Sequence, residues 1–359
     1  MSDVKGAVNC AVVGYGLYHD FGRMHCRWIS ACEELNLVGV CDIDQQARDR
    51  ARDDFPDIQT YASVPEMVAD DDLDMVSVVT PHFTHAQVAT QCLRAGKHVI
   101  VEKAMATSVD ECTQMIHEAR AADRKLAVFH NRRHDGNYRA IEQVISEGTI
   151  GEVFHIECCE ESWGRPQQWW YSEERKSGGV FFYWGPHAVD WVLNLVPSKV
   201  SRVAGATQRR LWSNVEIADE VRAYLWFDNG ATAVITFSRI AAIPKPLWHI
   251  LGTKGAIEDS KLGICEGNYI PHYQELLIGD AGEGRIRVVT VEGEKKAETQ
   301  VDYLASDWLT YYQDMAAAVL RDEPLPVTGE EGRMTVAVMQ AAQESGESGG
   351  TLIEIPDYD

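Results

Sequence analysis

The sequence predicts an α/β domain followed by an α+β domain, and three observations predict this fold class. Between residues 8 and 128, short apolar runs alternate with helical patterns, which is typical of parallel β-α-β units in a doubly wound sheet. After about residue 150, strand patterns follow one another with few helices between them, so we expect an open, mainly antiparallel sheet. The length of 359 residues suits two domains. We place the boundary near residue 130, which gives domains 1–130 and 131–359.

The strands expected in the first domain are apolar and rich in β-branched residues, and they cover residues 8–14, 37–41, 75–80, 98–102 and 126–129. The helices expected between them cover residues 22–33, 45–53, 85–95 and 109–122. Asp44 stands directly before the second of these helices, where an aspartate side chain caps backbone N–H groups of the first turn.

The strands expected in the second domain cover residues 153–161, 199–211, 220–227, 231–239, 248–252 and 285–291. Asp228-Asn229-Gly230 separates two of them as a hairpin turn, because Asn-Gly tolerates positive φ. One helix, from Pro186 to about Leu195, interrupts the strands, and helices over 308–320 and 332–345 end the chain. Helices would cover one sheet face only, so a symmetric copy is expected on the other, in a homodimer or homotetramer.

The charge and the cysteines limit the class of protein. Lys and Arg total 33 against 55 Asp and Glu, and the resulting net charge of −22 repels phosphate backbones and anionic membranes. We therefore expect a small-molecule partner rather than nucleic acid or membrane. The first eight residues are polar and carry no secretory signal pattern. Because the nine cysteines form no C-x-x-C pair, we expect a reduced, cytoplasmic protein.

A glycine-rich loop follows the first expected strand. Gly14-Tyr15-Gly16 comes directly after that strand, and Gly22 opens the next helix. In a dinucleotide-binding loop, the glycines allow a tight turn, a close approach to the pyrophosphate and close packing of the helix, whose N-terminus faces the phosphates. The spacing is G-x-G-x5-G, which is three residues longer than usual, but the strand before it and the helix after it fit. The sequence thus predicts a Rossmann domain that binds a dinucleotide.

Asp42 ends the second expected strand. A carboxylate at this position accepts hydrogen bonds from the adenosine ribose hydroxyls, and it repels the 2′-phosphate of NADP. We therefore expect NAD as the cofactor. The alternative is that Asp42 only solvates the end of a strand.

Further motifs resemble those of the glucose–fructose oxidoreductase / inositol dehydrogenase (Gfo/Idh/MocA) family. They span nearly the whole chain in order, and they are Thr80-Pro81-His82-Phe83-Thr84-His85, Ala95-Gly96-Lys97-His98-Val99-Ile100-Val101-Glu102-Lys103, Asn131-Arg132-Arg133, Gly178-Gly179-Val180 through Gly185-Pro186-His187 to Asp190-Trp191, and Pro324-Leu325-Pro326-Val327-Thr328. The second resembles the family's A-G-K-H-V-x-x-E-K-P and the fourth its G-G-x-x-x-D-x-G-x-H-x-x-D. The resemblance implies the two-domain fold and a dehydrogenase.

Two positions depart from the family's pattern. Ala104 replaces the proline after the lysine, and because a cis bond before a non-proline residue costs about 3 kcal/mol, we expect a trans peptide here. Tyr183 replaces the acid four residues before the histidine, which puts in doubt any mechanism that needs a carboxylate there.

The resemblance also implies roles for single residues. Lys103 would hydrogen-bond the reacting oxygen, and Glu102 would orient the nicotinamide ribose or Lys103 itself. His187 would be the general base; it follows Pro186, which suits the first turn of a helix, where the dipole favours the neutral imidazole. Cofactor contacts are further expected from Thr80, Pro81, His85 and Arg132. The alternatives are an exposed structural lysine at position 103 and a capping or packing role for His187.

The remaining candidate site residues are aromatic or lie close to aromatic residues in the sequence. Tyr183 could donate to the substrate oxygen or relay a proton through His187, or it could be an aromatic wall for a sugar, and both roles stay open. The sugar-binding candidates are Asn131, Trp163, Arg165 and Trp170, near Trp169 and Tyr171, although such a cluster could also form a core or a subunit contact. His25, His85 and His117 lie in helical patterns, where histidines are commonly structural, and no metal-binding motif is visible.

The sequence thus predicts an NAD-dependent dehydrogenase that acts on a CH–OH group of a sugar, sugar derivative or cyclic polyol. One alternative is an NAD-dependent glycosidase that oxidises its sugar transiently, which some members of the family are. A second is a non-catalytic NAD-binding sugar sensor, although the presence of both Lys103 and His187 argues against it.

Overall fold

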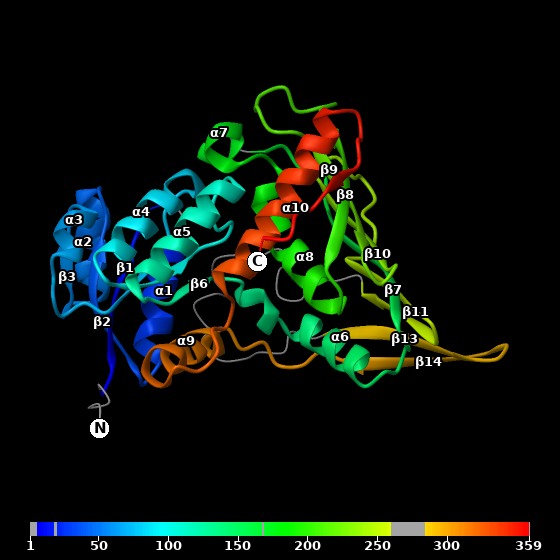
Figure 1. Cartoon of the computed structure of the whole chain (residues 1–359), viewed down its shortest axis with the longest axis horizontal. Coiled ribbons are helices and arrows are strands. Elements are labelled where there is room, and N and C mark those ends of the chain that lie inside the picture. Colours follow the sequence, from blue (N-terminus) through cyan, green and yellow to red (C-terminus); the bar gives the residue numbers. More distant parts are fainter. Residues whose placement is uncertain (1–5, 18–19, 167–168, 260–283, 359) are drawn as a thin grey trace. The chain divides into compact units, whose positions relative to one another are not determined.

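The computed structural model describes residues 6–17, 20–166, 169–259 and 284–358. They form two compact units (Figure 1). Among the described residues, the first unit comprises those up to Asn131 together with Asp307–Arg333, and the second comprises 132–259, 284–306 and those from Met334 onwards. None of the described helices is long and apolar enough to cross a membrane.

The first unit contains a six-stranded sheet in the order β3-β2-β1-β4-β5-β6, and all its neighbouring strands are parallel. Its strands are β1 (Val8–Val13), β2 (Leu35–Cys41), β3 (Gln59–Tyr61), β4 (Met75–Val78), β5 (His98–Val101) and β6 (Leu126–Val128). This is the strand order of the Rossmann fold, in which ligands bind at the carboxyl ends of the strands where the order reverses. The reversal lies between β1 and β4.

Helices cover both faces of this sheet (Figure 1). They are α1 (Phe21–Ala31), α2 (Gln45–Asp54), α3 (Val64–Val68), α4 (His82–Arg94), α5 (Val109–Ala122) and α9 (Leu309–Arg321). Helix α1 packs against α9, and α4 packs against α3 and α5. The strands β1, β4, β5 and β6 are buried along nearly their whole length, as expected for a parallel sheet that is covered on two sides. The prediction that Asp44 caps α2 is confirmed, because its carboxylate accepts from the Gln46 N–H at 2.8 Å.

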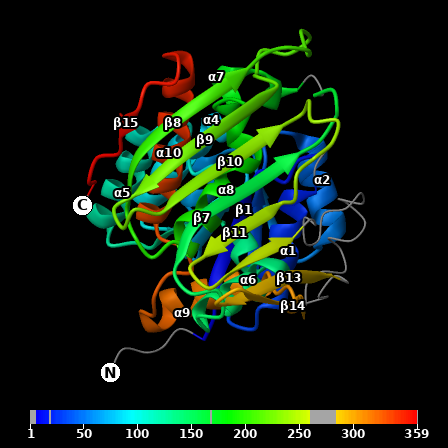
Figure 2. The ribbon, with the colours of Figure 1, turned by 90° about the vertical axis from the view of Figure 1, so that its right-hand side faces the viewer.

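The second unit is built on a nine-stranded sheet in the order β14-β13-β12-β11-β7-β10-β9-β8-β15 (Figure 2). Its strands are β7 (Val153–Glu161), β8 (Val200–Gln208), β9 (Glu220–Phe227), β10 (Thr232–Ser238), β11 (Trp248–Gly252), β12 (Gly255–Asp259), β13 (Arg285–Glu292), β14 (Lys295–Asp302) and β15 (Ile353–Glu354). The sheet is mainly antiparallel, as predicted. The exception is the central pair β7 and β10, which are parallel and place Glu161 opposite Ser238.

The helices of the second unit lie on one face of this sheet, and Figure 2 shows no described helix on the other face. They are η1 (Asn131–His134), α6 (Gly136–Ser146), η2 (Trp170–Ser172), α7 (Glu174–Ser177), α8 (Phe181–Leu195) and α10 (Gly329–Glu347), of which η1 and α10 also contribute residues to the first unit. Helix α8 packs against β7 and β10. Burial alternates along β9, with Val221, Ala223, Leu225 and Phe227 buried and the residues between them partly exposed, so only one sheet face belongs to the core.

The start of α8 differs from the prediction. The helix begins at Phe181 rather than Pro186, so the proline lies inside it. The sequence rule places proline in the first turn because it lacks an N–H, but the aromatic residues before Pro186 extend the helix by more than a turn. The predicted hairpin turn is confirmed: Gly230 has a φ of +87° between β9 and β10.

Candidate active site

The glycine loop after β1 has the backbone geometry that a dinucleotide-binding loop requires. Gly14 and Gly16 have φ angles of +94° and +70°, which L-residues with a side chain rarely adopt. A Cβ atom on Gly22 would lie 2.3 Å from the Gly14 carbonyl oxygen and 2.5 Å from the Tyr15 Cα. The start of α1 therefore lies directly against the loop. Tyr15 is buried, and its hydroxyl donates to Asp54 on α2 at 2.5 Å.

Asp42 holds the turn that follows β2. Its carboxylate accepts from the Gly16 N–H at 3.0 Å and from the Asp44 N–H at 2.8 Å. Asp42 therefore links the glycine loop to the end of the neighbouring strand, which is the position where a carboxylate meets the adenosine ribose in Rossmann domains.

His85 joins the loops that follow β4 and β5. It is fully buried; Nε2 lies 2.6 Å from the Thr80 carbonyl oxygen and Nδ1 lies 2.8 Å from that of Ala104. Burial lowers the pKa of His85, although the two carbonyl groups favour its charged form. Thr80 also accepts a hydrogen bond from the Thr84 hydroxyl at 2.7 Å, while Pro81 stands directly before α4 and is half-buried.

The peptide between Lys103 and Ala104 is cis, so the expectation of a trans bond is wrong. That expectation used only the intrinsic preference of an isolated peptide. Here Ala104 is buried and its carbonyl oxygen faces His85, so the surrounding fold rather than the local preference sets this segment.

Glu102 connects the backbone of Lys103 to a chain of buried polar side chains. One carboxylate oxygen accepts from the Lys103 N–H at 2.9 Å, and the other lies 3.1 Å from His25 Nε2. His25 Nδ1 lies 2.5 Å from the Tyr312 hydroxyl, which lies 3.1 Å from the Ser77 hydroxyl. His25, Tyr312 and Ser77 are almost fully buried. Sequence reasoning counted His25 as structural; its position three residues after Gly22, on one face of α1, was the available signal.

These contacts stabilise the ionised form of Glu102. Burial alone would raise the pKa of Glu102, but the contact with His25, the positive charge of Lys103 and the Lys103 N–H together lower it below its ordinary value. Glu102 is therefore a carboxylate at neutral pH, fixed beside Lys103 at the carboxyl end of β5.

In the second unit, α8 presents Tyr183 and His187. The two residues are four apart, so they lie on one face of the helix. His187 is 5% exposed and lies among aromatic rings, with its centroid 5.3 Å from Trp184 and 6.2 Å from Trp191. Because α8 begins at Phe181, His187 is not in the first turn, and the argument from the helix dipole for a neutral imidazole does not hold.

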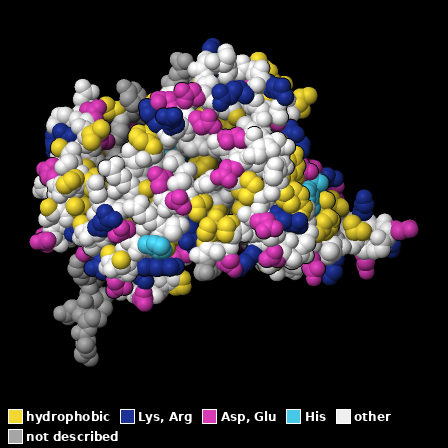
Figure 3. Space-filling model, turned by 45° about the horizontal axis from the view of Figure 1, so that its top comes forward, with side chains coloured by type: hydrophobic (Ala, Val, Ile, Leu, Met, Phe, Trp, Pro, Cys, Tyr) yellow, Lys and Arg dark blue, Asp and Glu magenta, His cyan; other side chains and the backbone are white. Residues whose placement is uncertain are grey.

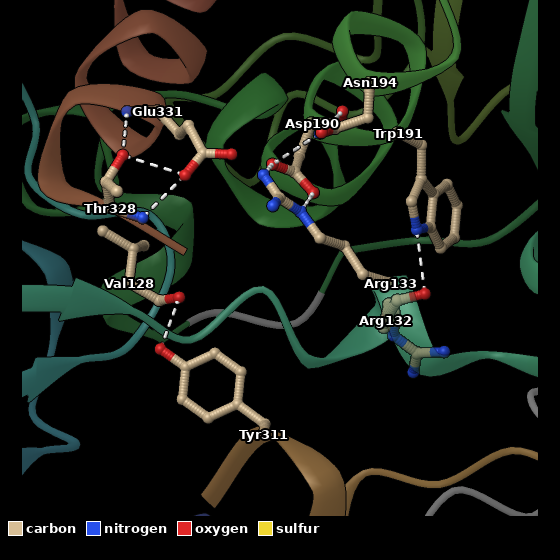
Figure 4. Close-up of polar contacts among 9 residues, drawn as sticks. All are labelled: Val128, Arg132, Arg133, Asp190, Trp191, Asn194, Tyr311, Thr328 and Glu331. Atoms are coloured by element: carbon tan, nitrogen blue, oxygen red, sulfur yellow. Dashed lines mark hydrogen bonds and ion pairs between the residues drawn. The ribbon is translucent and has the colours of Figure 1, made fainter. Parts of the chain in front are cut away.

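The segment before α6 is anchored to α8 by ionic and polar contacts (Figure 4). Arg133 donates to both oxygens of Asp190, at 2.9 and 2.7 Å. Trp191 Nε1 donates to the Arg132 carbonyl oxygen at 3.0 Å. The Arg132 side chain is buried, paired with Asp135 at 2.9 Å and 4.5 Å from the Trp184 ring centre. Asp190 and Trp191 of the family motif thus fix this segment, in which Arg132 is held.

Figure 4 also shows how the C-terminal motif is fixed within the first unit. Thr328 and Glu331 form a capping box at the start of α10, with the Glu331 carboxylate 2.7 Å from the Thr328 N–H. The Tyr311 hydroxyl donates to the Val128 carbonyl oxygen on β6 at 2.7 Å. Asn131, three residues after Val128, is buried.

The predicted aromatic cluster divides into two groups. Trp170 stacks on Tyr171 at 3.9 Å, and Tyr171 meets Tyr183 edge to face at 4.9 Å. Trp163 is 57% exposed and lies 6.0 Å from Trp212 instead. The remaining two members lie at the surface: Trp169 next to Trp170, and Arg165 with its Nε donating to Asn214 at 3.1 Å.

The sequence reasoning missed Arg239, which lies beside Tyr183, and Glu160, which pairs with Arg239. The guanidinium carbon of Arg239 is 5.6 Å from the centre of the Tyr183 ring, and Arg239 Nη1 is 3.4 Å from a carboxylate oxygen of Glu160. Glu160 is a charged residue on the face of β7 that carries Ile156 and Cys158 in the core. That interruption of an apolar alternation was the signal in the sequence.

Among the described residues, no group of His, Cys, Asp and Glu side chains could hold a metal ion. Acidic and basic side chains are interspersed over the face that Figure 3 shows. The first unit offers a glycine loop and a lysine with a fixed carboxylate, and the second unit offers a helix that carries a tyrosine and a histidine. These groups are suited to nucleotide binding and proton transfer.

Two family models match the chain. The model described as "Oxidoreductase family, NAD-binding Rossmann fold" matches residues 8–130, and the Gfo/Idh/MocA C-terminal domain matches residues 138–258. The predicted family and fold class are therefore confirmed.

Named relatives are similar along nearly the whole chain. The scyllo-inositol 2-dehydrogenase (NADP(+)) IolW of Bacillus subtilis is 26% identical over 96% of both chains. The myo-inositol 2-dehydrogenase of Thermotoga maritima is 23% identical over 93% of this chain and 95% of its own. The solved structure of Bacillus subtilis YvaA has the same fold, with a TM-score of 0.88 and 22% identity over 99% of this chain and 100% of its own. The chain is a member of the Gfo/Idh/MocA oxidoreductase family, with its NAD-binding Rossmann domain in the first unit.

Proposed function

We propose that this protein is an NAD-dependent dehydrogenase that oxidises a CH–OH group of a sugar, sugar derivative or cyclic polyol. The observation that carries the proposal is the fixed Glu102 carboxylate beside Lys103 at the carboxyl end of β5, the edge where open α/β sheets bind their ligands. The two inositol dehydrogenases among the relatives support a cyclic polyol or a related sugar as the substrate.

NAD fits the residues that are present. The positive φ angles of Gly14 and Gly16, and the absence of space for a Cβ on Gly22, leave the loop backbone open to a pyrophosphate. We propose that the adenosine ribose meets Asp42 and that Tyr15, Thr80, Pro81, His85, Glu102, Lys103 and Arg132 complete the cofactor site, with His85 acting through the loops that it joins. The bound nicotinamide supplies the hydride acceptor. IolW is NADP-linked, so the preference of this chain for NAD rests on the Asp42 carboxylate.

The reaction needs a group that polarises the alcohol oxygen and a group that takes its proton. We propose Lys103 for the first role, because its ammonium group can donate to the oxygen while Glu102 balances its charge. We propose His187 as the base that takes the proton, with Tyr183 on the same helix face either donating to the oxygen or forming a wall. Asn131, Trp163, Arg165 and Trp170 are proposed to contact the sugar, whose C–H faces pack on aromatic rings.

The sugar and the role of Lys103 are tested together. A panel of neutral sugars, sugar acids and inositols is incubated with NAD or NADP, and the reduced cofactor is followed by its absorbance. Lys103→Ala should lower kcat at least about 100-fold while NAD binding, measured by calorimetry, stays within about threefold. Lys125→Ala, which removes an exposed ion pair with Asp322, is the matched control. Full activity of Lys103→Ala would refute the assignment of the site.

We also propose that residues 131–359 form the substrate-binding and oligomerisation domain. The support for oligomerisation is the sheet face that Figure 2 shows without a helix, where Tyr224, Trp226, Val234 and Leu251 are only partly exposed. A second copy of this chain covers that face in the proposal, in a homodimer or homotetramer. Light scattering of the purified chain gives its mass, and Val234→Glu should shift it to that of a monomer.

A further inference from the structure

Glu160 has one carboxylate oxygen for which the described protein supplies no hydrogen-bond donor. The side chain lies near the carboxyl end of β7 and is 8% exposed. Oε1 lies 3.4 Å from Arg239 Nη1, but the buried Oε2 has no hydrogen-bond partner among the described residues. A buried carboxylate costs free energy unless its oxygens accept hydrogen bonds. This oxygen can therefore accept a further hydrogen bond from a ligand that carries a donor.

Arg239 contacts both Glu160 and Tyr183. Strands β7 and β10 are parallel neighbours, so their carboxyl ends lie side by side. Glu160, Ser162 and Arg239 lie at these two ends. Arg239 Nη1 also donates to the Ser162 hydroxyl at 2.6 Å, and its guanidinium carbon lies 4.7 Å from the Phe237 ring centre and 5.6 Å from that of Tyr183. The Arg239 side chain is 24% exposed. The guanidinium is therefore held between a buried carboxylate and the tyrosine of α8.

An aromatic group lies next to the same pair. Trp212 Nε1 donates to the Arg239 carbonyl oxygen at 3.2 Å, and the Trp212 ring meets the exposed Trp163 ring at 6.0 Å. The loop that carries Trp212 is fixed by the fully buried Asp219, whose carboxylate accepts the backbone N–H groups of Arg210, Leu211 and Trp212 at 2.5, 2.6 and 3.3 Å. Polar groups beside a fixed aromatic wall are the combination that recognises a sugar ring.

The charges of Glu160 and Arg239 indicate which chemical group of a substrate can bind between them. Glu160 balances the charge of Arg239, and Glu161 adds a negative charge next to it along the strand. Burial raises the pKa of Glu160, against the lowering effect of Arg239. A carboxylate on a substrate would be repelled by Glu160 and could not donate to its free oxygen. A neutral hydroxyl group can donate to Glu160 and accept from Arg239 at the same time.

We propose that Glu160 and Arg239 form a specificity-determining subsite that binds a hydroxyl group of a neutral polyol and discriminates against sugar acids. The proposal rests on the proposed function, since it places the subsite beside Tyr183 as a substrate-contacting residue. Glu160 Oε2 accepts a hydrogen bond from the hydroxyl group, the Arg239 guanidinium donates one to the hydroxyl oxygen, and the ring packs near Trp212.

The test measures kcat/KM of the full chain with NAD for myo-inositol, scyllo-inositol and D-glucose, and for the acids D-glucuronate and D-gluconate. The wild type should prefer a neutral compound. Glu160→Gln should lower kcat/KM for that compound about 10- to 100-fold, the value of a hydrogen bond to a charged group, and should raise kcat/KM for an acid, because the charge of Arg239 is then unbalanced. The control is Glu161→Gln, on the same strand, whose carboxylate accepts from the Lys245 N–H instead; it should leave the ratio of neutral to acidic substrates unchanged.

The outcomes separate the subsite from the proposed function. If the wild type oxidises a neutral polyol and Glu160→Gln does so equally well, the pair is only structural and the subsite is refuted, while the dehydrogenase stands. A wild type that prefers an acid refutes the subsite in the same way. If the wild type oxidises none of the five compounds, and none of them raises its melting temperature in the presence of NAD, then the proposed function fails and the subsite fails with it. Should Glu160→Gln not fold, Glu160→Asp keeps the charge and withdraws the oxygen, and the same loss of kcat/KM is expected.

Discussion

The imidazole of His25 bridges the carboxylate of Glu102 and the hydroxyl of Tyr312, with Nε2 3.1 Å from Glu102 Oε1 and Nδ1 2.5 Å from the phenol oxygen. The aromatic rings of Trp28 and Phe129 pack around the imidazole at 5.3 and 4.4 Å. A polar chain that is enclosed in this way has few alternative geometries. It fixes the direction of the Glu102 carboxylate, and through the Lys103 N–H it fixes the backbone that carries the proposed catalytic lysine.

Replacing His25 with Phe should make the enzyme more sensitive to acid. His25 and Lys103 lower the pKa of Glu102 in the native protein, so the carboxylate stays charged until the pH falls through a value below the ordinary 4.5. Without the contact with His25, the opposing effect of burial is larger relative to the remaining lowering effects, so the pKa of Glu102 should rise. In a profile of kcat/KM between pH 4 and 7, the acidic limb should move to higher pH.

Two further variants distinguish this effect from a loss of packing. His25→Gln keeps an N–H donor, and its acidic limb should lie between those of the wild type and His25→Phe. His117→Gln, on an exposed position of α5, should leave the profile unchanged. An acidic limb that stays in place in His25→Phe, with only a lower melting temperature, would show that His25 contributes stability alone.

Asp42 and Asp44 offer a matched pair for the choice of cofactor. Asp42→Ala removes the carboxylate that is proposed to exclude the 2′-phosphate, so the ratio of kcat/KM for NAD over NADP should fall about 10- to 100-fold. Asp44→Ala removes only the cap of α2, which should cost about 1 kcal/mol of stability and leave the ratio intact. Equal ratios in the two variants would contradict the assignment of Asp42.

Gly22→Ala should weaken NAD binding. The new Cβ would lie 2.3 Å from the carbonyl oxygen of Gly14, so the loop or the start of α1 must move by several tenths of an ångström. We expect the dissociation constant for NADH, measured by calorimetry, to rise at least about tenfold, with about 1–3 kcal/mol of lost stability. Gly6→Ala is the control, since no atom lies within 4 Å of the added Cβ. Unchanged affinity in Gly22→Ala would show that the packing of this glycine does not shape the cofactor site.

Breaking the pair of Arg133 and Asp190 on one side only should destabilise the protein strongly. Asp190 is 2% exposed and Arg133 17%, so Asp190→Ala leaves a poorly solvated guanidinium and should cost about 3 kcal/mol in urea unfolding. The double variant Arg133→Leu/Asp190→Leu should lose less. As a control, Asp357→Ala breaks the exposed pair with Lys199 and should cost under about 1 kcal/mol. A double variant as unstable as Asp190→Ala would contradict this account.

The sequence predicted elements best where neighbouring residues alone determine the structure, as in helix capping and in the alternation of strand residues. Helix α5 is predicted with its observed bounds, because Ser108 accepts from the Glu111 N–H at its start and Asp123 adopts a left-handed conformation at its end. The strands over 153–161, 220–227 and 248–252 are also confirmed, since alternating burial sets their limits.

The rest depends on partners that are distant in the chain. The parallel pairing of β7 and β10 joins segments that are about 80 residues apart, and no local pattern gives its direction. Likewise, nothing near Glu160 in the sequence names Arg239 as its partner, and nothing near His25 names Tyr312. The site residues proposed from the resemblance lie in short motifs, whereas the residues that contact them come from elsewhere in the fold.

The parallel central pair has a consequence for how such an enzyme can diversify. In an antiparallel pair the carboxyl end of one strand lies next to the amino end of its neighbour. Here the segments that follow β7 and β10 leave the sheet side by side, and Trp163 and Ile240 form an isolated bridge just beyond the strands. Two independent connections therefore start from one rigid platform. Insertions in either connection can reshape what is recognised without disturbing the hydrogen-bonded register beneath, so changes of substrate in descendants of this chain are expected to accumulate after residues 161 and 238.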